Sequence, residues 1–131
     1  MSKNLEYTLT LNSDQAHETL KAVELLMRLK INQPEELSRA LLEPMYERIG
    51  CYEFCQRRDE ANRFLQFAFL KIYPTMNDWM KDDEWYRLYN LYQSLRYAIH
   101  NAEHPQSTGV DSYPPTRFTD EPIPKCEWRT L

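Results

Sequence analysis

The chain has 131 residues, a net charge of −4 and a hydrophobic content of 42%, which together are typical of a single globular domain with its own core. The acidic balance disfavours general binding of duplex nucleic acid, which needs a basic face. No apolar run approaches the length of about 18 residues that a membrane-spanning helix needs.

The first pattern along the chain is an alternation over Leu5–Leu11. Its apolar residues, Leu5, Tyr7, Leu9 and Leu11, point one way and its polar residues the other, as in a half-buried strand. We therefore expect a small β-sheet in which this strand pairs elsewhere in the chain or across a subunit boundary. No apolar signal-peptide core accompanies it, so we expect a cytoplasmic protein.

Two helices are expected next. Asn12 or Ser13 can cap a helix that runs to about Lys30, since both side chains accept hydrogen bonds from free backbone N–H groups. Pro34 suits the start of a second, shorter helix, which must end before Pro44.

The segment Met45–Phe54 is ambiguous, with Gly50 allowing a turn. A third helix is expected from about Asp59 to Ile72, before a proline. Its apolar residues, including Phe67 and Leu70, extend almost all the way round the helix, which predicts a central position in the fold.

The segment Asp82–Glu103 is rich in aromatic residues and contains no glycine or proline. One helical stripe consists of Trp85, Leu88, Tyr89, Tyr92, Leu95 and Ile99. Tyr86, Leu91 and Tyr97 fall outside it, so a second helix, a partner subunit or a ligand must cover the excess. We expect a homo-oligomer, most simply a symmetric dimer.

After residue 104 the composition changes. Five of the eight prolines lie beyond this point, and apolar residues recur at intervals that suit docking. We expect residues 105–131 to form an extended arm on a helical body of residues 1–104, or on a neighbouring subunit. Short strand pieces fit Gly109–Tyr113 and Lys125–Trp128. The whole chain is then one α+β domain, mostly α, with about four helices, a small sheet and the arm.

Arginines near aromatic residues form the candidate binding site. Guanidinium groups recognise phosphates and aromatic rings stack on bases, so this combination suits a nucleotide-like ligand. The candidate residues are Arg57, Arg58, Arg96, Tyr97, Tyr113 and Arg117. The alternative is ordinary ion pairing of these arginines with neighbouring carboxylates.

Other chemistry has weaker signals. The pairs Cys51/Cys55 and His100/His104 each have i, i+4 spacing and together could bind zinc, although structural zinc sites more often use closer cysteines. Packing and surface roles explain them better, so we expect no metal and no cofactor. Two glycines in the whole chain leave no room for a usual phosphate-binding loop. No nucleophile motif is present either, and we do not expect an enzyme.

Three segments together resemble a group of short uncharacterised proteins of tailed phages and prophages. They are Tyr7–Ala16, Leu91–Ile99 followed by His104 and Pro105, and Glu121–Glu127. The resemblance supplies no catalytic residues. It implies a small accessory protein made in the cytoplasm of an infected bacterium.

Small phage accessory proteins often counter host defence, and this analogy sets the expected function. We expect a non-catalytic homo-oligomer that binds and sequesters a nucleotide-derived host immune signal. The alternatives are an inhibitor or adaptor that binds a host protein, and a structural or regulatory phage protein.

Overall fold

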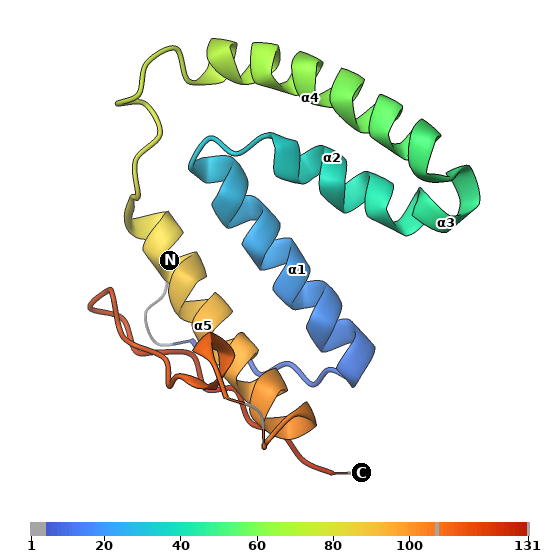
Figure 1. Ribbon diagram of the computed structural model, residues 1–131. Coiled ribbons are helices and arrows are strands. Elements are labelled where there is room, and N and C mark those ends of the chain that lie inside the picture. Colours follow the sequence, from blue (N-terminus) through green and yellow to red (C-terminus); the bar gives the residue numbers. More distant parts are fainter. Residues whose placement is uncertain (1–4, 107, 131) are drawn as a thin grey trace.

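The computed structural model describes residues 5–106 and 108–130, and the regular structure in them is helical (Figure 1). The elements are α1 (Ser13–Lys30), α2 (Glu35–Leu42), η1 (Glu43–Met45), α3 (Tyr46–Ile49), α4 (Cys51–Ile72), α5 (Asp83–Glu103) and η2 (Val110–Ser112). The prediction of a mostly helical chain is confirmed.

The predicted β-sheet is wrong, because none of the described residues forms a strand. The segment Leu5–Leu11 has no regular secondary structure, and the side chains of Leu5, Tyr7 and Leu9 are exposed. Alternation shows which side chains share a face, but a strand also needs a neighbour to complete its backbone hydrogen bonds. The described part of the chain supplies no such neighbour.

The strand pieces expected in the arm are also absent. Residues 110–112 form the helical turn η2, and Lys125–Trp128 has no regular structure. Both segments are short and lie next to prolines, and the described residues supply no strand to pair with them.

Local sequence signals define the helix starts. Asn12 and Gln15 form a capping box at α1, with Asn12 Oδ1 accepting from the Gln15 backbone N–H at 2.9 Å. Asp82 caps α5 by accepting from the Trp85 backbone N–H at 2.8 Å, which lowers the pKa of Asp82 below its ordinary value. Gly50 separates α3 from α4 with a φ of 82°, a conformation that suits glycine.

Helices α1 and α5 pack side by side and antiparallel, because each end of α1 contacts the opposite end of α5. Near the end of α1, the buried Trp85 indole donates a hydrogen bond to the Met27 carbonyl at 3.1 Å. Near its start, Ser13 and His17 contact Glu103 at 2.5 and 2.6 Å. This helix pair contains the buried Met27, Trp85 and Ala98.

Two buried amide side chains hold the arm against α5. Gln93 donates to the Thr116 carbonyl at 2.9 Å and accepts from the Thr116 backbone N–H at 3.1 Å. Asn90 donates to the Thr119 hydroxyl at 3.0 Å and accepts from the Phe118 backbone N–H at 3.2 Å. Two side chains from one turn of α5 thus supply hydrogen-bond partners for the backbone of Thr116 and Phe118, which has no neighbouring strand to pair with.

The excess aromatic surface of α5 is covered within the chain. The ring of Phe118 from the arm stacks on Tyr86 with centroids 5.9 Å apart and contacts Tyr89 edge-on at 5.2 Å. Trp85 in turn stacks on Tyr89 at 5.2 Å. For Tyr86, therefore, the arm provides the cover that the sequence required, whereas Leu91 and Tyr97 are half-buried.

Helix α4 packs mainly on α2, where the Ser38 hydroxyl donates to the Asn62 side chain. With 22 residues against 8, α4 is about 33 Å long and α2 about 12 Å. Helix α4 therefore extends beyond its neighbour and lies at the edge of the molecule (Figure 1). The prediction of a central third helix is wrong, since Phe67 and Leu70 are exposed.

Candidate functional site

The predicted site begins with two arginines on the first half of α4. Arg57 Nε lies 2.7 Å from Glu53 Oε1, and Arg58 Nη2 lies 3.2 Å from Asp59 Oδ1. The Arg58 guanidinium also lies 5.8 Å from the centre of the Phe54 ring. Both charges thus have partners on their own helix, as the alternative interpretation in the sequence anticipated.

Arg96 and Tyr97 lie on α5, where Arg96 supports the arm. Its side chain is 16% exposed and its guanidinium lies over the Tyr92 ring, 5.0 Å from the centroid. Its Nε atom is 3.6 Å from Asp111 of η2, which makes an ion pair too long for a hydrogen bond. That Nε atom is buried without a hydrogen-bond partner.

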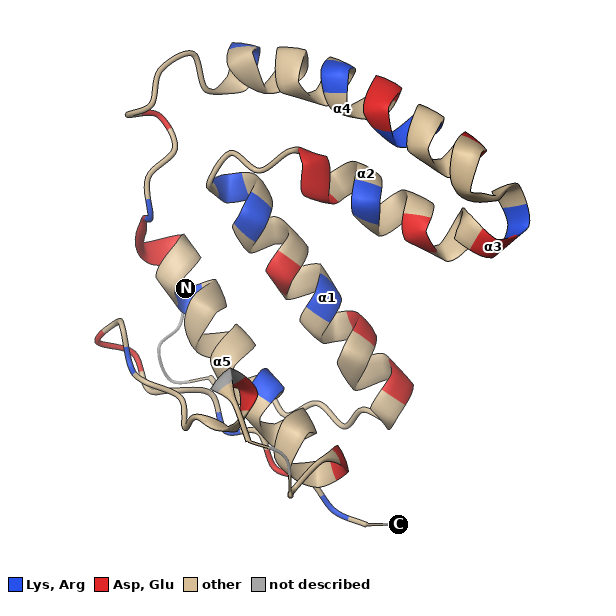
Figure 2. Ribbon diagram, in the orientation of Figure 1, with Lys and Arg blue, Asp and Glu red and all other residues tan. Residues whose placement is uncertain are grey.

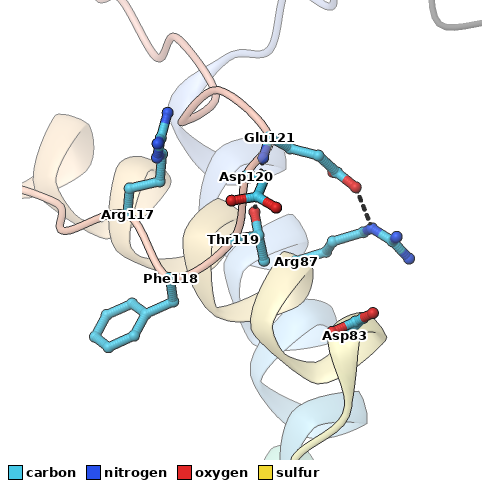
Figure 3. A pocket seen from close by; sticks show the side chains of 7 residues that line it. All are labelled: Asp83, Arg87, Arg117, Phe118, Thr119, Asp120 and Glu121. Atoms are coloured by element: carbon cyan, nitrogen blue, oxygen red, sulfur yellow. Dashed lines mark hydrogen bonds and ion pairs between the residues drawn. The ribbon is translucent and has the colours of Figure 1, made fainter.

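Tyr113 and Arg117 are exposed residues of the arm. Arg117 borders an open hollow of about 640 Å³ between the arm and the start of α5, lined by Asp83, Arg87, Arg117, Phe118, Thr119, Asp120 and Glu121. Figure 3 shows Arg117 and Phe118 on one side of Thr119, with Arg87 and Asp83 on the other.

The charges of this hollow partly cancel. Glu121 lies 2.5 Å from Arg87 Nε, and this hydrogen bond and charge raise the pKa of Arg87 above its ordinary value. Two further acidic residues, Asp83 and Asp120, line the same hollow. A phosphate group entering here would meet more carboxylates than guanidinium groups.

Within one chain, the six predicted residues lie on three separate segments. Arg57 and Arg58 are on α4, whereas Arg96, Tyr97, Tyr113 and Arg117 are on α5 and the arm. Helix α4 and the arm lie at opposite ends of the view in Figure 1. The structure therefore brings Arg96 close to the arm but does not gather all six residues around one space.

A different surface, which the sequence reasoning missed, is the outer face of α4. We use this name for the exposed side formed by Glu60, Arg63, Phe64, Phe67 and Lys71, with Leu70 at its edge, where Leu70 borders a hollow shared with Pro34 and Glu35. Phe64 is 78% exposed and Phe67 is 64% exposed. In Figure 2, the half of α4 that leads to α5 has uncharged turns between its charged bands.

Exposed apolar side chains continue past the end of α4. Ile72, the last residue of α4, is exposed, as are Met76 and Met80 in the connection that leads to α5. Monomeric soluble proteins seldom leave a large contiguous apolar surface uncovered. The sequence signal was the pair Phe67 and Leu70, which lie outside the main apolar stripe of this helix. Assigning them to the surface instead of the core would have located this face.

The cysteines and histidines remain on two distant elements. Cys51 and Cys55 are in the first turns of α4, whereas His100 and His104 are at the end of α5, with ring centroids 6.4 Å apart. The described residues contain no group of three or more His, Cys, Asp or Glu placed to hold a metal ion.

Comparison with protein-family models, curated proteins and solved structures gives no match for this chain. Among the described residues, no helix combines the length and apolar character needed to cross a bilayer.

Proposed function

We propose that the chain is a non-catalytic accessory protein that works by binding another polypeptide on the outer face of α4. The observation that supports this most directly is the exposure of Phe64 and Phe67 side by side on a helix that packs mainly on the much shorter α2. Exposed apolar surface of this kind is typical of protein–protein contacts.

The shape of the surface favours a polypeptide over a small molecule. Small-molecule sites are concave and bury most of their ligand, whereas the outer face is one side of a single projecting helix (Figure 1). The two described hollows, of about 640 and 260 Å³, are open, and only Leu70 of the outer face borders either one. A flat or grooved protein surface is the partner that buries such a helix.

The resemblance to short phage proteins supplies the setting of the proposal. An accessory protein that covers part of a host protein in the bacterial cytoplasm needs an interaction surface and no catalytic centre. The outer face of α4 meets that requirement, and this is the inhibitor or adaptor alternative raised by the sequence.

Site-specific photocrosslinking in cells tests the proposal. A photoreactive phenylalanine analogue replaces Phe67, and the matched control carries it at Tyr113, which has the same level of exposure, 63% against 64%. We expect a covalent adduct with a polypeptide from position 67 and none from position 113. Absence of any polypeptide adduct at position 67 contradicts the proposal.

Sequestration of a nucleotide-derived signal is the second candidate. The observation in its favour is that Arg117, which forms no ion pair within the described residues, lies next to Phe118 at the edge of the open hollow. Calorimetry against cyclic nucleotides and ADP-ribose derivatives should then show heat of binding that Arg117→Ala removes. A wild-type protein that gives no heat with this panel contradicts the second candidate.

A further inference from the structure

The outer face of α4 carries its side chains in a self-complementary order. Glu60, Phe64, Phe67 and Lys71 follow one another at intervals of four, three and four residues. At about 100° per residue these four positions lie within a sector of about 60°, so they form one narrow stripe. Read from either end, the stripe is a charge, two rings and the opposite charge.

We infer that the polypeptide bound by the outer face is a second copy of this chain. This inference rests on the proposed binding of a polypeptide there, and it puts a second copy in place of a host protein as the occupant of the face. When two α4 helices cross antiparallel about a two-fold axis between Phe64 and Phe67, Phe64 of one copy meets Phe67 of the other. The same operation places Glu60 against Lys71, twice. A two-fold interface needs such a self-complementary patch.

The charges of the stripe are available for this pairing. Within the described part of the chain, neither Glu60 nor Lys71 forms an ion pair, whereas Arg57 and Arg58 are both paired on the same helix. The Lys71 ammonium lies 5.5 Å from the centre of the Phe67 ring, so it already lies over the apolar part of the stripe. A second copy would supply the carboxylate that Lys71 lacks.

The available area suits a dimer of modest affinity. At 150–250 Å² per aromatic side chain, Phe64 and Phe67 together expose roughly 200–350 Å². A standard interface buries about 800 Å² on each partner, so these two rings supply about a third of it. The exposed Leu70 lies about 60° round the helix from Phe67 and adds to the surface beside the stripe. Interfaces of the standard size have micromolar or lower dissociation constants, so an interface built around these two rings is expected at the micromolar, weak end of that range.

Sedimentation equilibrium of the full chain with charge-reversal variants tests the inference. We expect the wild type to dimerise at micromolar concentrations. Glu60→Lys and Lys71→Glu each create two like-charge contacts and should weaken the dimer about 10- to 100-fold. Glu47→Lys, an equal charge change at an exposed position on α3, is the control and should leave the dimer constant unchanged.

Mixing the two weakened variants gives the sharpest result. In a heterodimer of Glu60→Lys with Lys71→Glu, both contacts again join opposite charges, so an equimolar mixture should recover the wild-type dissociation constant. Far-ultraviolet circular dichroism confirms that each variant is folded. A wild type that stays at 15.8 kDa up to about 100 μM overturns the inference, and so does a dimer that these substitutions leave unchanged or whose mixture is not restored.

Failure of this inference is distinguishable from failure of the proposed function. In the photocrosslinking experiment at position 67, an adduct of twice the chain mass supports a second copy. An adduct with a different protein overturns the second copy but supports the proposed function. No polypeptide adduct contradicts both.

Discussion

Removal of the Gln93 amide should release the arm from α5 without unfolding the helices. Gln93 is buried and forms two hydrogen bonds with the backbone of Thr116. A typical hydrogen bond contributes about 0.5–1.5 kcal/mol, so Gln93→Ala should weaken arm docking by about 1–3 kcal/mol. Since each 1.4 kcal/mol is a factor of ten, the open state of the arm should become about 5- to 150-fold more populated.

Amide hydrogen exchange followed by NMR measures this opening. The Phe118 backbone N–H is the reporter, because it donates to Asn90 and keeps that partner in the Gln93→Ala variant. We expect its exchange to accelerate about 5- to 150-fold, with amides at the centre of α1 unchanged. The control, Arg117→Ala, removes an exposed side chain from the same segment and should leave the exchange rate as it is. Unchanged protection of Phe118 in Gln93→Ala would refute the role given to this amide.

Three further predictions concern the helical scaffold. Trp85→Phe leaves the Met27 carbonyl at the end of α1 without its indole donor, so urea unfolding should show a loss of about 1–3 kcal/mol, and Trp128→Phe, at an exposed position, should change stability by less than about 0.5 kcal/mol. Hydrogen bonds from Ser13 and, second, from His17 lower the pKa of Glu103. The stabilising effect of the ionised Glu103 is therefore fully present above the ordinary glutamate pKa and disappears as the pH falls through the lowered value. Glu103→Gln should flatten this acid limb of a stability–pH curve, and an unchanged acid limb argues against the contact. Gly50→Ala forces a side chain into a φ of 82° and should cost about 1–3 kcal/mol in the same urea assay, whereas equal stability of the two proteins excludes strain there.

Local signals explain which parts of the fold could be predicted. Asn12 and Asp82 act as caps through side chains that reach only three residues along the chain, so their effect is visible in the sequence itself. The start of α4 could not be placed from the sequence in this way. Gly50 indicates a turn, but the helix begins directly after it, at Cys51, within a segment whose apolar pattern is ambiguous.

Long-range arrangement explains the errors. The alternation at Leu5–Leu11 is compatible with a strand, yet only a distant neighbour could have made it one. Apolar residues all round α4 predict that other parts of the protein cover the helix, but they do not show which parts. The prediction therefore placed Phe67 in the core, whereas its side chain is exposed. For the candidate site, proximity to aromatic residues in sequence did not reveal that Arg57 and Arg96 are on helices that pack against different partners.

Under the proposed function, the edge position of α4 places the binding surface apart from the buried interior. Outward side chains such as Phe64 add little to the interior, and surface replacements of this kind usually change stability by no more than about 0.5 kcal/mol. Related chains could therefore diverge on this helix and acquire new binding preferences, while the α1–α5 pair and the arm docked on it stay the same. Sequence drift concentrated on one side of α4, with Met27 and Gln93 retained, would be the evolutionary signature of that freedom.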